Sequence, residues 1–222
     1  VIAVALLTTL AAAAVLATRW FPVLDKPTSI GEYIEDPLTI GSQFVLTIVA
    51  FFAILVMADR TVVGDGAFAG QPSDRPGSQD EERSDTQNYQ RSEMFPLTLF
   101  SLGGMMLFPA ADSYIMLFVA LEVMSLPLYI LAATARRRRQ LSQEAGMKYF
   151  ILGAFASGFL LMGSALLYGF TGSLKISDAA AVVPTANGLD WLAVVGVFMI
   201  MVGLLFKVGA APFHAWTPAV YT

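Results

Sequence analysis

The sequence predicts an all-α integral membrane protein with about six transmembrane helices. Of the 222 residues, 56% are hydrophobic and only 14% are charged, whereas soluble domains carry about 25% charged residues. Apolar runs long enough to cross a bilayer core, about 20 residues, recur along the chain. The mean hydropathy is +0.66. A soluble helical protein would need polar faces at helical spacing, and Leu38–Ala58 lacks them.

The candidate spans are separated by three polar loops and one very short turn. The third span is short, and Pro109 followed by Asp112 predicts a tight turn into the fourth. These spans divide the chain into residues 1–93, with two helices and a polar loop over 59–93, and residues 94–222, with the rest. The spans are Val1–Ala17, Leu38–Ala58, Met94–Pro109, Tyr114–Ala133, Gln143–Tyr168 and Leu189–Ala211.

The basic residues of the loops predict the orientation in the membrane. The loops Thr18–Pro37 and Phe170–Gly188 together hold three Lys and Arg residues, whereas Asp59–Glu93 and Thr134–Ser142 together hold eight. Cytoplasmic loops carry the excess of basic residues. We therefore expect the second pair of loops in the cytoplasm, and we interpret Arg136–Arg139 as a topological anchor.

The loop Asp59–Glu93 is rich in Gly, Pro, Ser, Asp and Gln, which indicates a flexible cytoplasmic segment. Within it, Thr61–Gly70 superficially resembles a strand that enters a dinucleotide-binding glycine turn. That fingerprint requires a helix and a returning strand over about 30 residues. Only 24 positions separate Gly70 from Met94, so we reject a dinucleotide site.

Composition excludes several other classes. The chain has no cysteine, which excludes a disulfide framework and cysteine-held zinc or iron–sulfur clusters, and one histidine leaves no two-histidine metal site. The net charge of −4 argues against nucleic acid. No signal peptide is evident, because no basic flank precedes Val1–Ala17. The start at Val1 and the stop at Thr222 lead us to expect a segment of a longer protein.

Two charges of opposite sign lie in the middle of apolar spans, at Glu122 and Lys207. A charge near the bilayer centre costs at least ~2.5–3.5 kcal/mol on insertion scales, so each needs a reason to be there. Each is followed five residues later by a proline, Pro127 and Pro212, which we predict to break the helix and admit water beside the charge. The alternative is a static buried ion pair that only joins two helices.

Two further groups are ambiguous from the residues alone. Lys148 follows Glu144 by four residues and lies near the cytoplasmic end, which favours an ordinary surface ion pair. His214 follows Lys207 by two helical turns, a position that suits either a proton relay or an interfacial hydrogen bond. Small residues of the fifth span, from Gly153 to Gly163 and including Ser157, are interpreted as a close helix-packing strip.

Three stretches resemble the antiporter-like subunits of proton-pumping NADH:quinone oxidoreductase, respiratory complex I. They are Leu117–Tyr129, Glu144–Ser157 and Gly203–Pro218. The resemblance is specific over 95–222, whereas over 1–93 it is one of topology only. It implies that residues 94–222 form the first half-channel unit of a longer antiporter-like bundle, whose second, inverted repeat is absent from this chain.

The resemblance also implies a function and a site. It assigns proton translocation to Glu122, Lys148, Lys207 and His214, in a subunit of a translocase in the bacterial cell membrane. It implies no cofactor, metal, redox centre or NADH site in this chain, and it places FMN, iron–sulfur clusters and quinone in partner subunits. The expected partners are other membrane subunits of the complex, including the homologous antiporter-like ones, and the lipid bilayer. A subunit of a multisubunit cation/proton antiporter and a non-transporting scaffold remain alternatives.

Overall fold

A computed structural model describes residues 1–58, 78–79, 93–134, 139–182 and 190–221. Five of its helices are long and apolar enough to cross a membrane, and a shorter apolar helix accompanies them. The expectations for residues 61–70, for Arg136–Arg138 and for most of the 59–93 loop lie outside the described residues. The five long helices are α1 (Ile2–Asp25), α2 (Pro37–Ala58), α5 (Tyr114–Ala133), α6 (Arg139–Thr171) and α8 (Trp191–Val208). The shorter apolar helix is α4 (Met94–Leu107), which continues as the 3-10 turn η1 (Phe108–Ala110).

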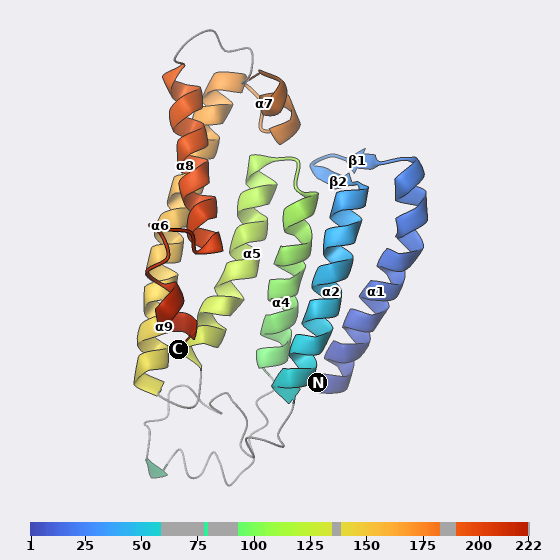
Figure 1. Cartoon of the computed structure of the whole chain (residues 1–222), viewed down its shortest axis with the longest axis vertical. Helices are drawn as coiled ribbons and strands as arrows, with labels where there is room; N and C mark the ends of the chain where they lie inside the picture. The colour runs from blue at the N-terminus through green and yellow to red at the C-terminus, as the bar shows by residue number, and fades with distance from the viewer. Residues whose placement is uncertain (59–77, 80–92, 135–138, 183–189, 222) are drawn as a thin grey trace.

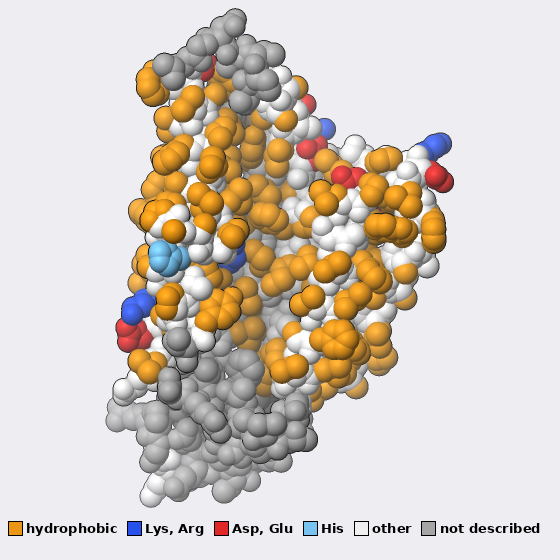
Figure 2. Space-filling model, in the orientation of Figure 1, with side chains coloured by type: hydrophobic (Ala, Val, Ile, Leu, Met, Phe, Trp, Pro, Cys, Tyr) orange, Lys and Arg blue, Asp and Glu red, His pale blue; other side chains and the backbone are white. Residues whose placement is uncertain are grey.

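These helices stand side by side, and each packs on the next in the order α1, α2, α4, α5, α6 and α8 (Figure 1). Apolar side chains cover most of the face seen in Figure 2, as expected for a surface that meets lipid rather than water. Two short helices, α7 (Ile176–Val182) and α9 (Thr217–Tyr221), complete the described helices. The chain is therefore the multi-pass helical membrane protein that the hydropathy pattern predicted.

Small residues let neighbouring helices of the bundle approach closely. A Cβ atom added at Gly104 of α4 would meet the backbone of Met124 on α5. One added at Gly163 of α6 would meet the backbone of Gly196 on α8, and one added at Gly203 would lie 2.8 Å from Leu160. Glycine at such contacts lets the backbones pack together, which is how apolar helices associate in a bilayer.

Two short strands were not expected in the first polar loop. The helix α1 runs past the predicted end at Ala17 as far as Asp25, and β1 (Thr28–Ile30) then pairs with β2 (Tyr33–Glu35) as an antiparallel hairpin. A bidentate ion pair fixes this arrangement, because Arg19 donates from Nε to Glu35 Oε1 at 2.8 Å and from Nη2 to Oε2 at 2.5 Å. The guanidinium holds the pKa of Glu35 below its ordinary value.

The turn between η1 and α5 binds elements on both of its sides. Asp112 N donates to the Glu32 carbonyl of the hairpin at 2.9 Å, and Ser113 Oγ donates to Glu32 Oε2 at 2.6 Å. On the other side, the Asp112 carboxylate accepts from Ser177 N at 3.2 Å and from Ser177 Oγ at 3.1 Å. Asp112 and Ser113 are buried. We call this turn, residues 111–114, the outer junction.

The expected interruption of the last helix is present between Val208 and Thr217, but glycine sets where α8 ends. Gly209 adopts a left-handed conformation with φ +71°. Its N–H donates to the Phe206 carbonyl, and Ala210 N donates to the Leu205 carbonyl at 2.9 Å, which is the hydrogen-bond pattern of a Schellman motif.

The two prolines therefore act differently from our expectation. Pro212 lies in the turns after the end of α8 and occupies no helical position from which it could open the Val208 carbonyl. Pro127 lies inside α5, which continues to Ala133, so it removes one backbone donor without ending the helix.

Candidate functional site

The ammonium of Lys207, in the last turn of α8, has two hydrogen-bond partners on other helices. Nζ donates to Ser125 Oγ on α5 at 2.6 Å and to Tyr149 Oη on α6 at 3.0 Å. The Ser125 hydroxyl donates its own proton to the Leu121 carbonyl. Because the hydroxyl proton already forms this hydrogen bond, Ser125 Oγ can only act as the acceptor for Lys207. The lysine thus ties the end of α8 to both α5 and α6.

The carboxylate of Glu122 has a hydroxyl partner of its own. It lies on α5 one turn before Ser125 and accepts a hydrogen bond from Ser157 Oγ on α6. Among the described residues, ion pairs within 4.0 Å join Arg19 to Glu35 and Lys148 to Glu144, and none joins Glu122 to Lys207. The two mid-span charges still interact electrostatically. Each charge is therefore bound by a hydroxyl rather than by the other.

Two tyrosine rings lie close to the ammonium of Lys207. Lys207 Nζ lies 5.2 Å from the ring centroid of Tyr149 and 5.7 Å from that of Tyr129, within the range of cation–π attraction. The Tyr149 ring stacks on Trp216, with centroids 4.4 Å apart and planes 9° apart. The indole N–H of Trp216 donates to the Phe206 carbonyl at 3.1 Å. The segment after α8 thus folds back onto the residue that precedes Lys207.

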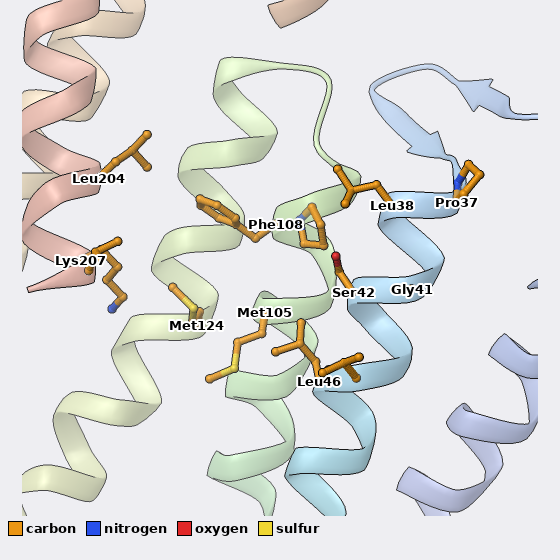
Figure 3. Close-up of a pocket in the computed structure, with 13 residues that line it drawn as sticks. Pro37, Leu38, Gly41, Ser42, Leu46, Met105, Phe108, Met124, Leu204 and Lys207 are labelled. Atoms are coloured by element: carbon orange, nitrogen blue, oxygen red, sulfur yellow. The ribbon is translucent and has the colours of Figure 1, made fainter.

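Lys207 also lines an apolar groove of about 1000 Å³ between α8 and the helices α2, α4 and α5. Figure 3 shows the lysine reaching from the end of α8 toward α5, beside Met124. Among the described residues that line the groove, Lys207 is the one charged side chain, and none is a carboxylate that could pair with its ammonium. The lining residues are Pro37, Leu38, Gly41, Ser42, Val45, Leu46, Met105, Phe108, Pro109, Met124, Leu204, Lys207 and Val208.

The other two predicted site residues lie outside this network. Lys148 Nζ is 2.5 Å from Glu144 Oε1, and both side chains are more than half exposed, so the surface ion pair expected from the residues alone is present. His214 is exposed in the turns after α8, and the histidine is visible on the outside of the chain in Figure 2. The structure therefore places Glu122 and Lys207 in the same region between α5, α6 and α8, without a direct ion pair, and it places Lys148 and His214 outside that region.

Sequence reasoning missed Ser125 and Tyr149 and misjudged Ser157. We interpreted Ser157 as a packing residue, yet it is the hydrogen-bond donor to Glu122. A signal was available, because a buried polar group in lipid requires a partner. Ser125 lies three residues after Glu122, on the same side of the helix, so it was within reach of whatever group approached that carboxylate.

The family comparison covers this site directly. The transmembrane family described as NADH:quinone oxidoreductase/Mrp antiporter matches residues 111–222, which hold Glu122, Ser125, Tyr149 and Lys207. The chain belongs to this family. The resemblance predicted from the three sequence stretches is therefore confirmed.

Among relatives in this family, the chain is similar to subunit N of NADH-quinone oxidoreductase. It is 48% identical to that subunit from Beutenbergia cavernae over 230 residues, which cover 99% of this chain and 43% of the relative. It is 52% identical to that from a Nocardioides species over 177 residues, which cover 79% of this chain and 33% of the relative. The chain thus spans less than half the length of these relatives.

Two solved structures show the same fold. Respiratory complex I from Thermus thermophilus with bound aureothin matches with a TM-score of 0.71 and 33% identity, over 98% of this chain and 40% of that one. The Mrp complex from a Dietzia species matches with a TM-score of 0.71 and 20% identity, over 98% of this chain and 39% of that one. At that identity the second match shows the fold alone.

Proposed function

We propose that this chain carries one proton-conducting unit of a membrane subunit of NADH:quinone oxidoreductase, and that Glu122 and Lys207 are its central proton-binding groups. Transport would be coupled to quinone reduction elsewhere in the complex. The observation that carries the proposal is the separation of the two charges, since each is held by a hydroxyl group. Charges placed this deep in apolar helices are expensive and are retained where they serve transport.

The separation gives the pair a means of controlling a proton. A carboxylate beside an ammonium stabilises the charged lysine, and moving the two apart withdraws that stabilisation. Lys207 is within reach of both Ser125 and the Glu122 region, because these residues lie one turn apart on α5. A small shift of α8 against α5 would therefore change how tightly the lysine holds its proton.

The two alternatives are less well supported. A scaffold would gain most from a direct, permanent ion pair, and the described residues hold Glu122 and Lys207 apart. The cation/proton antiporter alternative is supported only by the shared fold of the Mrp complex from a Dietzia species. The relatives with 48% and 52% identity are subunits of NADH-quinone oxidoreductase, which favours that enzyme.

Lys148 and His214 belong to the proposal as groups farther along the path. Both are exposed in the described part of the chain, so a further helix or subunit has direct access to them. We also propose that the partners are other membrane subunits of the complex, including homologous antiporter-like subunits. On this proposal, FMN, iron–sulfur clusters and quinone are bound by the partners.

The test uses the assembled complex in inverted membrane vesicles, with NADH oxidation and acidification measured together. We expect Glu122→Gln and Lys207→Ala each to lower the ratio of protons pumped to NADH oxidised, or to slow both if the two are tightly coupled. Glu122→Asp should retain part of the activity, because the charge remains on a shorter side chain. Lys175→Ala is the matched control, since it removes an exposed lysine outside the spans.

Normal assembly with wild-type pumping in both Glu122→Gln and Lys207→Ala would refute a proton role. Normal pumping by those complexes that do assemble, together with a lower yield of assembled complex, would instead favour the scaffold. Co-purification of this chain with flavin and iron–sulfur subunits would separate the oxidoreductase from the cation/proton antiporter.

A further inference from the structure

Tyr149 differs from the other partner of Lys207 in what its hydroxyl group can do. Ser125 has committed its proton to the Leu121 carbonyl, so it can only accept. Tyr149 Oη accepts from Lys207 at 3.0 Å, and its own proton has no acceptor in the part of the chain that the structure describes. A phenol can therefore accept from the ammonium and, after rotation of its O–H bond, donate to the neutral amine.

The position of this hydroxyl group is fixed by a closed ring of contacts. Tyr149 is 4% exposed and stacks on Trp216. Trp216 donates to the Phe206 carbonyl, and Phe206 directly precedes Lys207, whose ammonium returns to Tyr149. The segment that follows α8 and the lysine side chain are thus coupled through one phenol ring. Movement of that segment would move the acceptor of the ammonium.

We propose that Tyr149 is a positioning residue that holds Lys207 in its separated position, away from Glu122, through the phenol oxygen. This inference rests on the proposed function of the Glu122 and Lys207 pair and deepens it. Glu122 is the alternative partner, and Tyr149 competes with it for the same ammonium. Because charge-assisted hydrogen bonds depend strongly on distance and geometry, removing the phenol oxygen should shift the lysine toward the carboxylate.

Among the residues that the structure describes, few titratable groups surround the ammonium, so a change in pH dependence can be assigned to them. From α5, Glu122 and Tyr129 face the ammonium. From α6, Tyr149 faces the ammonium, and Tyr221 of α9 interacts electrostatically with Tyr149. Lys148 and Glu144, the neighbouring charges on α6, pair with each other at exposed positions.

The test is Tyr149→Phe in the assembled complex, with proton pumping by inverted vesicles measured as a function of pH. The ring and its stack on Trp216 remain, and only the oxygen is lost. We expect normal assembly, pumping reduced several-fold, and an alkaline limb of the pH profile displaced upward by about one unit. That displacement corresponds to a tenfold tighter hold on the proton by the carboxylate-paired lysine. Tyr168→Phe, which removes a hydroxyl from an exposed tyrosine of the same helix, is the matched control.

The outcomes separate this inference from the proposed function. If Lys207→Ala abolishes pumping while Tyr149→Phe keeps the wild-type pH profile, the function stands and the role of Tyr149 is wrong. If Lys207→Ala pumps normally, the proposed function itself is wrong. A downward displacement in Tyr149→Phe, or loss of assembly despite the intact ring, would also overturn the positioning role. A smaller upward displacement in Trp216→Phe, which removes the indole donor to Phe206, would support it.

Discussion

Replacing Gly209 by alanine tests whether this glycine sets the end of α8. With φ +71°, any residue with a Cβ atom at this position adopts the left-handed region, which costs roughly 1–2 kcal/mol. The added Cβ would also lie 2.9 Å from Thr217 Oγ1, and overpacking of this kind costs about 1–3 kcal/mol. We therefore expect Gly209→Ala to lower the free energy of unfolding by about 2–5 kcal/mol.

A second glycine provides the matched control. Gly172 follows α6 with φ +70°, and a Cβ atom there would meet nothing within 4 Å. Gly172→Ala should therefore cost only the backbone part, about 1–2 kcal/mol. The difference between the two variants measures the contact with Thr217. SDS titration of the purified protein in mixed micelles, followed by tryptophan fluorescence, gives both free energies.

Thr217 supplies the decisive comparison. Among the described residues, its Oγ1 is a buried side-chain oxygen without a hydrogen-bond partner, so Thr217→Ala alone should be neutral or stabilising. In the double variant with Gly209→Ala, loss of this oxygen should recover most of the difference from Gly172→Ala. Equal costs for the two glycine variants, or no recovery in the double variant, would refute the contact between position 209 and Thr217. A Gly209→Ala variant as stable as the wild type would refute the assignment of the helix end to Gly209.

Three further predictions concern other parts of the chain. Because Arg19 lowers the pKa of Glu35, the stability that this carboxylate provides is present above its ordinary pKa of 4.5 and is lost as the pH falls through the lower, folded value. Glu35→Gln should therefore lower the unfolding free energy at pH 7 and flatten its acid dependence; an unchanged slope would contradict the role of this pair. Gly104→Ala should destabilise by about 1–3 kcal/mol through contact with the α5 backbone, whereas Gly103→Ala, with open space around it, should be neutral or stabilising in the same titration. In this cysteine-free chain, single cysteines at Gln79 and Lys26 should label from opposite sides of sealed vesicles, and labelling from one side would contradict the topology.

The spans could be predicted because lipid leaves the backbone few choices. Without water, each N–H and C=O must be satisfied within the segment, so a long apolar run forms a helix. Where the chain leaves the bilayer core, that constraint ends, and the prediction for the first polar loop was wrong. The extension of α1 to Asp25 and the following hairpin depend on the contact between Arg19 and Glu35, 16 residues apart. Hydropathy carries no information about such a pair.

The charged residues of the candidate site could be predicted from the sequence, but their hydrogen-bond partners could not. Glu122 and Lys207 stand out because a charge in an apolar run is costly. Ser125, Tyr149 and Ser157 are ordinary residues of membrane helices, and only the packing of α5, α6 and α8 gives them their roles. The end of α8 shows the same limit, because proline is the stronger sequence signal for a helix break, yet Gly209, three residues before Pro212, ends the helix.

The outer junction has a mechanical consequence for the site. Residues 111–114 bind the hairpin on one side and the segment that follows α6 on the other, so the two parts of the chain are fastened together where α5 begins. Ser125 lies 12 residues farther along α5, about 18 Å away at 1.5 Å per residue. With the bundle fastened there, a given rotation about this pivot produces a displacement that grows with distance along the lever. If the hairpin side tilted against the segment that follows α6, atoms near residues 111–114 would move least and atoms near Lys207 would move more. A small tilt about the junction would therefore move Ser125, the hydrogen-bond acceptor of Lys207, farther than it moves Ser113.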